Sequence, residues 1–143
     1  MLIADVLAKK GNKVFKILQD KMVMDAVTGM ASFKVGAVVV VDPKDGVLGI
    51  FTERDVTRIL ASQGAAVLQT PVGEHMTPNP ITCTSTDDDS AVLALMSKHR
   101  FRHMPVLDHG TLIGIVSIRD VVSQRLERVE FEAEAMRAYV TAG

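Results

Sequence analysis

Two copies of one short polar motif are the residues in this sequence most able to do chemistry. Each copy contains a hydroxyl side chain, then an arginine and an aspartate: Thr52, Arg54 and Asp55, and again Ser117, Arg119 and Asp120. Each copy stands where an apolar segment ends and a helix is expected to begin, so the hydroxyl can cap that helix. A helix N-terminus attracts anions. The motif therefore suits a phosphate, with the arginine adding charge and the aspartate accepting hydrogen bonds from ribose hydroxyls.

The same residues permit a second interpretation, in which they are ordinary capping boxes that stabilise helix starts and bind nothing. The motifs close two similar segments, residues 49–55 and 114–120, which lie 65 residues apart and share Gly, Ile, Arg and Asp in the same order. The repetition supports an internal duplication. It does not by itself prove a ligand, so both interpretations stay open.

Hydrophobic periodicity and turn residues predict a β-α-β-β-α unit in each half of the chain. The predicted elements of the first half are residues 14–17, 22–33, 37–41, 47–51 and 53–62, and those of the second half are 81–83, 89–98, 104–107, 112–116 and 118–126. Prolines and a glycine prevent a continuous helix or sheet over residues 70–80, so we expect this segment to connect the two halves. One half exposes too much apolar strand to stand alone, so we expect an α/β (α+β) fold in which the two units pack as a pseudo-two-fold pair.

We divide the chain into residues 1–70 with the first unit, residues 71–127 with the second, and a C-terminal tail at 128–143. The tail is expected to be helical over 127–139, with one apolar side that packs on its own domain or on a partner subunit.

Composition narrows the function classes. The 143 residues are 48% hydrophobic with a net charge of -1, which leaves no basic excess for nucleic acid. Cys83 is the single cysteine, so no internal disulfide can form, and it is expected to be a small core residue. The longest uninterrupted apolar run, Ala91 to Met96, is far too short to span a membrane. We expect a cytoplasmic protein with no membrane contact.

The duplicated unit resembles the CBS (cystathionine β-synthase-type) domain family, and the whole resembles its stand-alone bacterial pairs. The supporting segments are residues 36–42 and 102–108, which match the central strand of the family, and residues 75–82, which match the lead-in to a second motif. The lead-in to the first motif, residues 5–11, departs from the family pattern because it lacks the Met-Thr pair.

The resemblance implies two clefts that bind adenosyl ligands, with no metal and no catalysis. One cleft would use Ile50, Thr52, Arg54, Asp55, Thr77, Pro80, His103 and Met104. The other would use Val35, Gly36, Ala37, Arg102, Ile115, Ser117, Arg119 and Asp120. We expect AMP-type nucleotides first and NAD(H) second, bound either as two mononucleotides or as one ligand that reaches across both clefts.

The resemblance also implies a homodimer and an unknown downstream protein. The expected dimer interface consists of Met22, Val23, Met24, Val27, Met30, Leu93 and Met96. The alternative function is a ligand-free interaction or assembly module. His99 and His103 are four residues apart, which is a spacing for metal ligands, but no third ligand stands nearby. Asp87 to Asp89 suit the acidic start of a helix better than a magnesium site.

Overall fold

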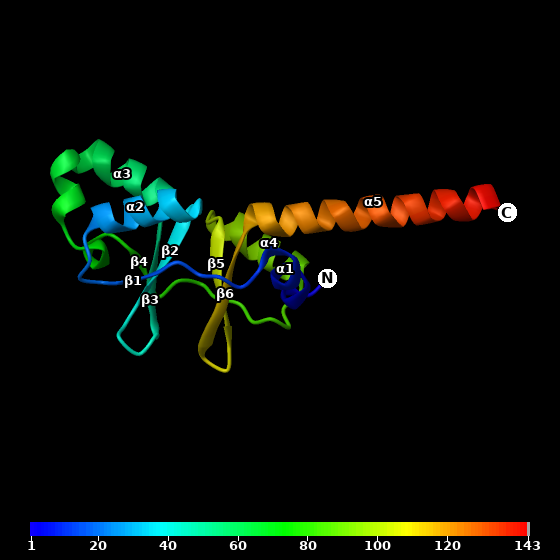
Figure 1. Cartoon of the computed structure of the whole chain (residues 1–143), viewed down its shortest axis with the longest axis horizontal. Helices are drawn as coiled ribbons and strands as arrows, with labels where there is room; N and C mark the ends of the chain where they lie inside the picture. The colour runs from blue at the N-terminus through cyan, green and yellow to red at the C-terminus, as the bar shows by residue number, and fades with distance from the viewer. Residues whose placement is uncertain (143) are drawn as a thin grey trace.

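The computed structural model describes residues 1–142, and its first half follows the predicted order (Figure 1). The elements are β1 (Lys16–Leu18), α2 (Val23–Phe33), β2 (Ala37–Val41), β3 (Val47–Thr52) and α3 (Glu53–Gln63). β2 is buried along its whole length, as expected for an uninterrupted β-branched run. α2 buries Val23, Ala26 and Met30, whose spacing places them on one helix face.

The second half contains α4 (Asp89–His99), β5 (His103–Asp108), β6 (Thr111–Ser117) and α5 (Ile118–Ala142). The strand expected over residues 81–83 is reduced to one parallel bridge between Cys83 and Val106. Cys83 donates its N–H to the Pro105 carbonyl and accepts from the Leu107 N–H. The pairing stops there because the flanking Thr82 and Thr84 are exposed and have no buried face to hold them against β5.

An unpredicted helix, α1 (Ile3–Lys10), opens the chain. Its buried residues Ile3, Val6 and Leu7 belong to the hydrophobic core of the second half, together with Val92 and Met104. The N-terminal segment therefore packs against the unit that is distant from it in sequence. This placement brings the end of α1 next to β6 and α5.

The connection between the halves contains more regular structure than expected. Two 3₁₀ turns, η1 (Ala65–Gln69) and η2 (Val72–Glu74), precede a two-residue strand, β4 (Thr77–Pro78). β4 pairs antiparallel with β3 and completes a sheet of order β1-β2-β3-β4, while β5 and β6 form a separate two-stranded sheet. The regular pieces between residues 70 and 80 are short, and Pro78 is tolerated in β4 because it lies on an edge strand.

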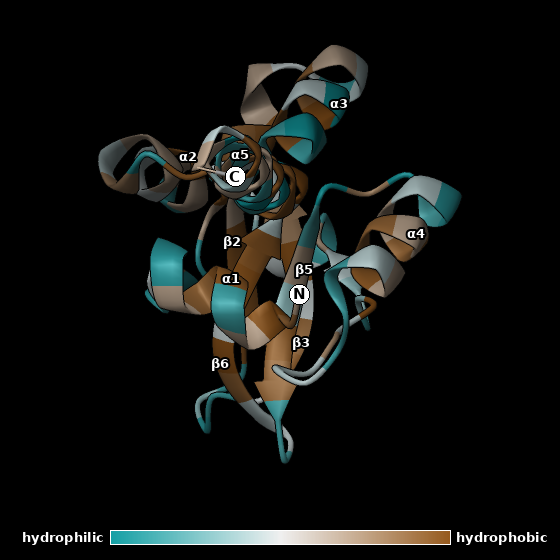
Figure 2. Cartoon of the chain, turned by 90° about the vertical axis from the view of Figure 1, so that its right-hand side faces the viewer, coloured by the Kyte–Doolittle hydropathy of each residue, from teal (hydrophilic) through white to brown (hydrophobic). Residues whose placement is uncertain are grey.

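The two sheets pack against each other through a shared apolar cluster. Val39 and Ile50 of the first half meet Ile115 of the second half there. Equivalent hydrogen bonds recur in the two halves: Glu53 N–H donates to the Gly36 carbonyl at 3.0 Å, and Ile118 N–H donates to the Arg102 carbonyl at 2.8 Å. Hydrophobic colour is concentrated on the strands between the helices (Figure 2). The predicted α/β pair with pseudo-two-fold packing is confirmed.

α5 is one continuous helix of 25 residues, where two successive helical segments were expected. No glycine or proline occurs between Ile118 and Ala142 to interrupt it. The helix leaves the body of the molecule and ends far from it (Figure 1). Over residues 1–142, no helix is both long enough and apolar enough to cross a bilayer.

The dimer interface expected on α2 and α4 needs correction. Val23, Met30 and Met96 are buried within the protomer, where they build its own two cores. They cannot supply an interface between copies without unfolding those cores. Met22 and Met24 stay exposed.

Candidate functional site

Both repeated motifs form capping boxes. At the start of α3, the Thr52 hydroxyl accepts from the Asp55 N–H at 3.4 Å, and an Asp55 carboxylate oxygen accepts from the Thr52 N–H at 2.8 Å. At the start of α5, Ser117 and Asp120 make the same two bonds, at 3.1 Å and 2.9 Å. The capping interpretation is thus confirmed as local structure. It also fixes each carboxylate at a helix N-terminus, where an anion would be favoured.

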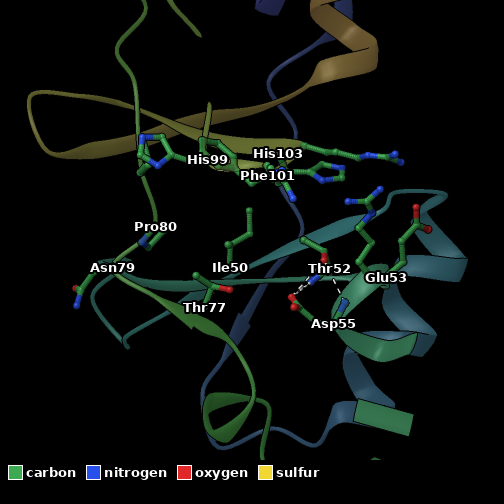
Figure 3. A pocket seen from close by; sticks show the side chains of 14 residues that line it. Ile50, Thr52, Glu53, Asp55, Thr77, Asn79, Pro80, His99, Phe101 and His103 are labelled. Carbon is green, nitrogen blue, oxygen red and sulfur yellow. Dashed lines mark hydrogen bonds between the residues drawn. The ribbon is translucent and has the colours of Figure 1, made fainter. Parts of the chain in front are cut away.

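The first cleft is a cavity of about 420 Å³ between the start of α3 and the segment that joins α4 to β5. Figure 3 shows Ile50, Thr52 and Asp55 on one side, His99, Phe101 and His103 facing them, and Thr77 and Pro80 at one end. Seven of the residues predicted for this cleft line it: Ile50, Thr52, Arg54, Asp55, Thr77, Pro80 and His103. Met104 does not line it, because its side chain is fully buried in the core of the second half.

Five residues that were not predicted for either cleft also line the first one: Glu53, Asn79, Ile81, His99 and Phe101. Arg102, which was predicted for the second cleft, lines both clefts, and Arg100 lines the first. Asn79 and Arg100 have φ angles of 47° and 58°, a backbone conformation that non-glycine residues rarely adopt. Their positions depend on the turn at β4 and on the end of α4, neither of which has a clear sequence signal.

The second cleft is larger, about 940 Å³, and it is built in the same way from the opposite halves. All the residues predicted for it line it: Val35, Gly36, Ala37, Arg102, Ile115, Ser117, Arg119 and Asp120. Lys34 ends α2 in the left-handed conformation, as Arg100 ends α4, and each lies at the cleft that holds the other half's motif. Each cleft therefore joins the capped helix of one half to the helix end of the other.

Comparison with known proteins agrees with this arrangement. The model of the CBS domain matches residues 3–62 and again residues 72–127. The chain belongs to the CBS domain family. A mitochondrial CBS domain-containing protein of Arabidopsis thaliana is 36% identical over 99% of this chain and 72% of its own length. The crystal structure of a CBS-domain protein from Agrobacterium tumefaciens superposes with a TM-score of 0.85, at 42% identity, over 87% of this chain and 99% of that one.

Two more distant CBS structures share the fold and contain ligands. The CBS pair of protein MJ0100, in complex with 5′-methylthioadenosine and S-adenosyl-L-methionine, has a TM-score of 0.80 at 23% identity, over 90% of this chain and 98% of that chain. A CBS protein of Pyrobaculum aerophilum complexed with AMP has a TM-score of 0.75 at 24% identity, over 84% of this chain and 89% of that chain.

The second CBS motif differs from the first because Lys10 reaches its carboxylate. The Lys10 ammonium lies 2.6 Å from Asp120 Oδ2 and also donates to the Ile115 carbonyl. Burial acts to raise the pKa of Asp120, but the hydrogen bonds from Lys10 and Ser117 and the charge of Lys10 outweigh it, so the pKa lies below its ordinary value. The unusual lead-in sequence Lys9-Lys10-Gly11 was the only sequence feature that pointed to this contact. It can be interpreted only once α1 is known to pack on the second motif.

Three side chains line both CBS clefts: Glu53, Arg102 and His103. Burial, followed by the positive charge of Lys10, lowers the pKa of His103 below its ordinary value. The imidazole is therefore neutral at neutral pH. The wall between the clefts carries its positive charge on Arg102.

The residues whose spacing resembled metal ligands make other contacts in the structure. Within residues 1–142, no three His, Cys, Asp or Glu side chains come close enough together to hold an ion. His99 instead stacks on Phe101, with 6.4 Å between ring centroids. Asp88 caps α4 by accepting from the Ser90 N–H at 3.2 Å, the role expected for an acidic helix start.

Proposed function

We propose that this CBS pair is a regulatory sensor that binds an adenine mononucleotide of the AMP type, in the first cleft before the second. The observation that carries the proposal is the first cleft itself, in which Asp55 and the start of α3 line the same cavity as Arg100 and Arg102. A cavity of about 420 Å³ falls in the size range of small-ligand sites.

The side chains that line the first cleft suggest where each part of the nucleotide binds. The ribose hydroxyls donate to Asp55, whose side chain is 15% exposed and held by the capping box and by Arg58 at 3.2 Å. The phosphate lies at the N-terminus of α3, where the Thr52 hydroxyl and the arginines stabilise its charge. The adenine ring packs against the apolar side chains of Ile50 and Phe101.

The distant CBS relatives support an adenosyl ligand in general, because their structures contain AMP, 5′-methylthioadenosine and S-adenosyl-L-methionine. The charge of this chain's clefts favours an anionic member of that group, since the sulfonium of S-adenosyl-L-methionine gains nothing from the arginines. NAD(H) comes second, because its further ribose needs the space beyond Arg102 and His103 in the second cleft.

A regulatory role fits the reactive groups better than an enzymatic one. The thiol of Cys83 is buried, and burial raises its pKa to about 12, so it is no nucleophile at neutral pH. The motif hydroxyls serve as helix caps. The residues of the clefts are therefore suited to binding a ligand and not to transforming it.

Isothermal titration calorimetry with AMP tests the proposal. Asp55→Asn removes a charge-assisted hydrogen bond to the ribose, which should weaken AMP binding by about 10- to 150-fold. The matched control is Asp25→Asn, because Asp25 accepts from the Met22 N–H at 3.1 Å in an equivalent cap on α2, away from both clefts. If the two variants weaken AMP equally, the effect comes from helix capping alone.

A panel of ligands separates this function from the alternative. The parent protein is titrated with AMP, ADP, ATP, NADH and S-adenosyl-L-methionine under one set of conditions. If no ligand of the panel binds, the proposal of a nucleotide sensor is wrong and the ligand-free interaction module becomes the function.

A further inference from the structure

The last turns of α5 extend away from the other elements described over residues 1–142 (Figure 1). Near its start the helix packs on α1, α4 and β6, and Val121 is fully buried there. The Lys9–Glu127 ion pair, at 3.5 Å, joins the helix to α1 at the point where it leaves the body. The CBS family match also ends at residue 127. From there to Ala142 the helix extends away from the body (Figure 1).

One side of this extension carries apolar residues that are spaced alternately four and three residues apart. The stripe consists of Val122, Leu126, Val129, Ala133, Met136 and Val140. Its members other than Ala133 are 41% to 68% exposed, which is unusual for large apolar side chains on one helix face. Alternating steps of four and three residues repeat every seven residues, which is the repeat of a two-stranded coiled coil, in which each residue of the stripe packs into a second helix.

The charged residues on either side of the stripe determine which helix can pair with it and in which orientation. In a parallel pair, Glu132 lies next to Arg137 of the other helix, and Arg125 lies next to Glu130, so every flanking contact of this kind joins opposite charges. In an antiparallel pair that keeps the whole stripe in contact, Glu130 meets Glu130 and Glu132 meets Glu132. This self-complementary pattern fits a second copy of the same helix in parallel.

The body of the protomer leaves room for that second helix. Val121 faces the body, whereas the next stripe residues, Val122 and Leu126, are 41% and 58% exposed. The stripe is therefore uncovered by the protomer's own body from its first residue. Both flanking pairs exchange a surface contact for one across the interface, because within the protomer Arg125 donates to the Ser90 hydroxyl at 3.0 Å and Arg128 donates to Glu132 at 3.4 Å.

We propose that α5 binds α5 of a second copy in parallel through this stripe and so holds two CBS pairs together as a dimer. The stripe covers just under three heptads and has a small residue, Ala133, at its centre. The dimer is therefore of moderate affinity, and its population depends on protein concentration. The pairing is independent of any nucleotide in the clefts.

Sedimentation velocity of the full chain, over a range of concentrations, measures the dimer. Met136→Lys places a charge in the stripe and should abolish it. Phe131→Lys is the matched control, because Phe131 is 73% exposed on the same helix but lies opposite the stripe, so its dimer should persist. A parent protein that stays monomeric, or a dimer that Met136→Lys leaves intact, overturns the proposal.

Charge reversal tests the flanking pair. Glu132→Arg alone and Arg137→Glu alone should each raise the dimer dissociation constant about tenfold, because two symmetric contacts become repulsive. The double variant should restore the affinity of the parent. If the double variant is as weak as the singles, Glu132 and Arg137 are not neighbours across the interface.

Disulfide crosslinking tests the direction. In a parallel pair the two Val140 residues face each other, so Val140→Cys should crosslink under mild oxidation, whereas Ala138→Cys, on the far side of the helix, should not. Cys83 does not interfere, because it is buried and its pKa is raised to about 12. An antiparallel pair places Val140 against Val122, so a dimer without a Val140→Cys crosslink overturns the parallel arrangement.

Discussion

The ammonium group of Lys10 lies 2.6 Å from the carboxylate of Asp120, and both side chains are about one-quarter exposed. Asp55, the equivalent of Asp120 in the first CBS motif, has a different cation: Arg58 of its own helix, at 3.2 Å, with a side chain that is 62% exposed. A ribose that enters the second cleft must compete with a half-buried lysine for its acceptor. In the first cleft it meets only a solvated arginine.

Replacing Lys10 should therefore improve nucleoside binding in the second cleft. In an Asp55→Asn background, which weakens the first cleft, Lys10→Met should raise the affinity for adenosine about tenfold or more, because the Asp120 carboxylate becomes free. Adenosine is the ligand of choice because it carries no phosphate that could use the lysine itself. Calorimetry gives both the affinity and the stoichiometry.

The control for this prediction is Lys9→Met. Lys9 precedes Lys10 on α1, but it is 66% exposed and pairs with Glu127 outside the cleft, so its loss should leave adenosine binding unchanged. A decrease of affinity in Lys10→Met would contradict the prediction and would make Lys10 a direct ligand contact.

The stability of the unliganded protein should depend on pH through His103. Burial and the charge of Lys10 lower its pKa in the folded state, whereas the unfolded chain has the ordinary value of 6.5. Between these two values the unfolded chain binds a proton and the folded chain does not. The free energy of unfolding should therefore fall as the pH drops from above 6.5 toward the lowered pKa of the folded state.

Urea unfolding of the parent and of His103→Gln, across that range, measures the effect, and the variant should show a shallower pH dependence. The titration of Asp88, Asp108 and Asp120 does not contribute to the difference between the two proteins in this pH range. Their pKa values are lowered by hydrogen bonds, so the stability that they contribute is lost only below about 3.8, their ordinary value. Equal slopes in both proteins would show that His103 titrates alike in the folded and unfolded chains.

Gly49 should be intolerant of a side chain. A Cβ built at this position would lie 2.7 Å from the Thr77 carbonyl oxygen and 2.5 Å from the Met76 sulfur. The carbonyl belongs to β4 and cannot rotate away, so Gly49→Ala should force β3 and β4 apart and destabilise the protein by about 1–3 kcal/mol. The midpoint of urea unfolding measures this loss, and AMP binding should weaken with it because Thr77 lines the first cleft.

Gly36→Ala is the comparison for Gly49. Its nearest neighbour would be a Glu53 carboxylate oxygen at 3.1 Å, the end of a flexible side chain that can move. This variant should lose much less stability than Gly49→Ala. If both lose the same amount, close contact with the β4 backbone is not the cause.

Cys83 should be unreactive in the folded protein. The thiol is 4% exposed, and burial raises its pKa to about 12. A thiol reagent at neutral pH should modify it only after denaturant is added, which mass spectrometry detects. Rapid modification of the native protein would mean that residues 83 and 106 separate readily.

Sequence alone predicted the elements whose residues carry their own pattern. β2 needs no neighbour to be identified, because Ala37 to Val41 are all apolar and mostly β-branched. α1 is different, because its apolar residues are buried by the second CBS motif, which is distant in the sequence. β4 pairs through its backbone, so no side-chain pattern distinguishes Thr77 from the loop around it.

The candidate site divides in the same way. Thr52, Asp55, Ser117 and Asp120 were identified from their spacing, which is a local property of helix starts. Lys10 could not be assigned, because its position depends on how α1 packs. Met104 was misplaced because alternate residues of a strand point to opposite faces, and the face that Met104 takes is the core.

The wall that Glu53, Arg102 and His103 share has a thermodynamic consequence. A phosphate that draws Arg102 toward the first cleft removes that charge from the second, and a ligand in the second cleft does the reverse. If both clefts bind phosphorylated ligands, as proposed, each ligand therefore weakens the binding of the other. By linkage the factor is the same in both directions, so the occupancy of one cleft depends on the concentrations of both ligands.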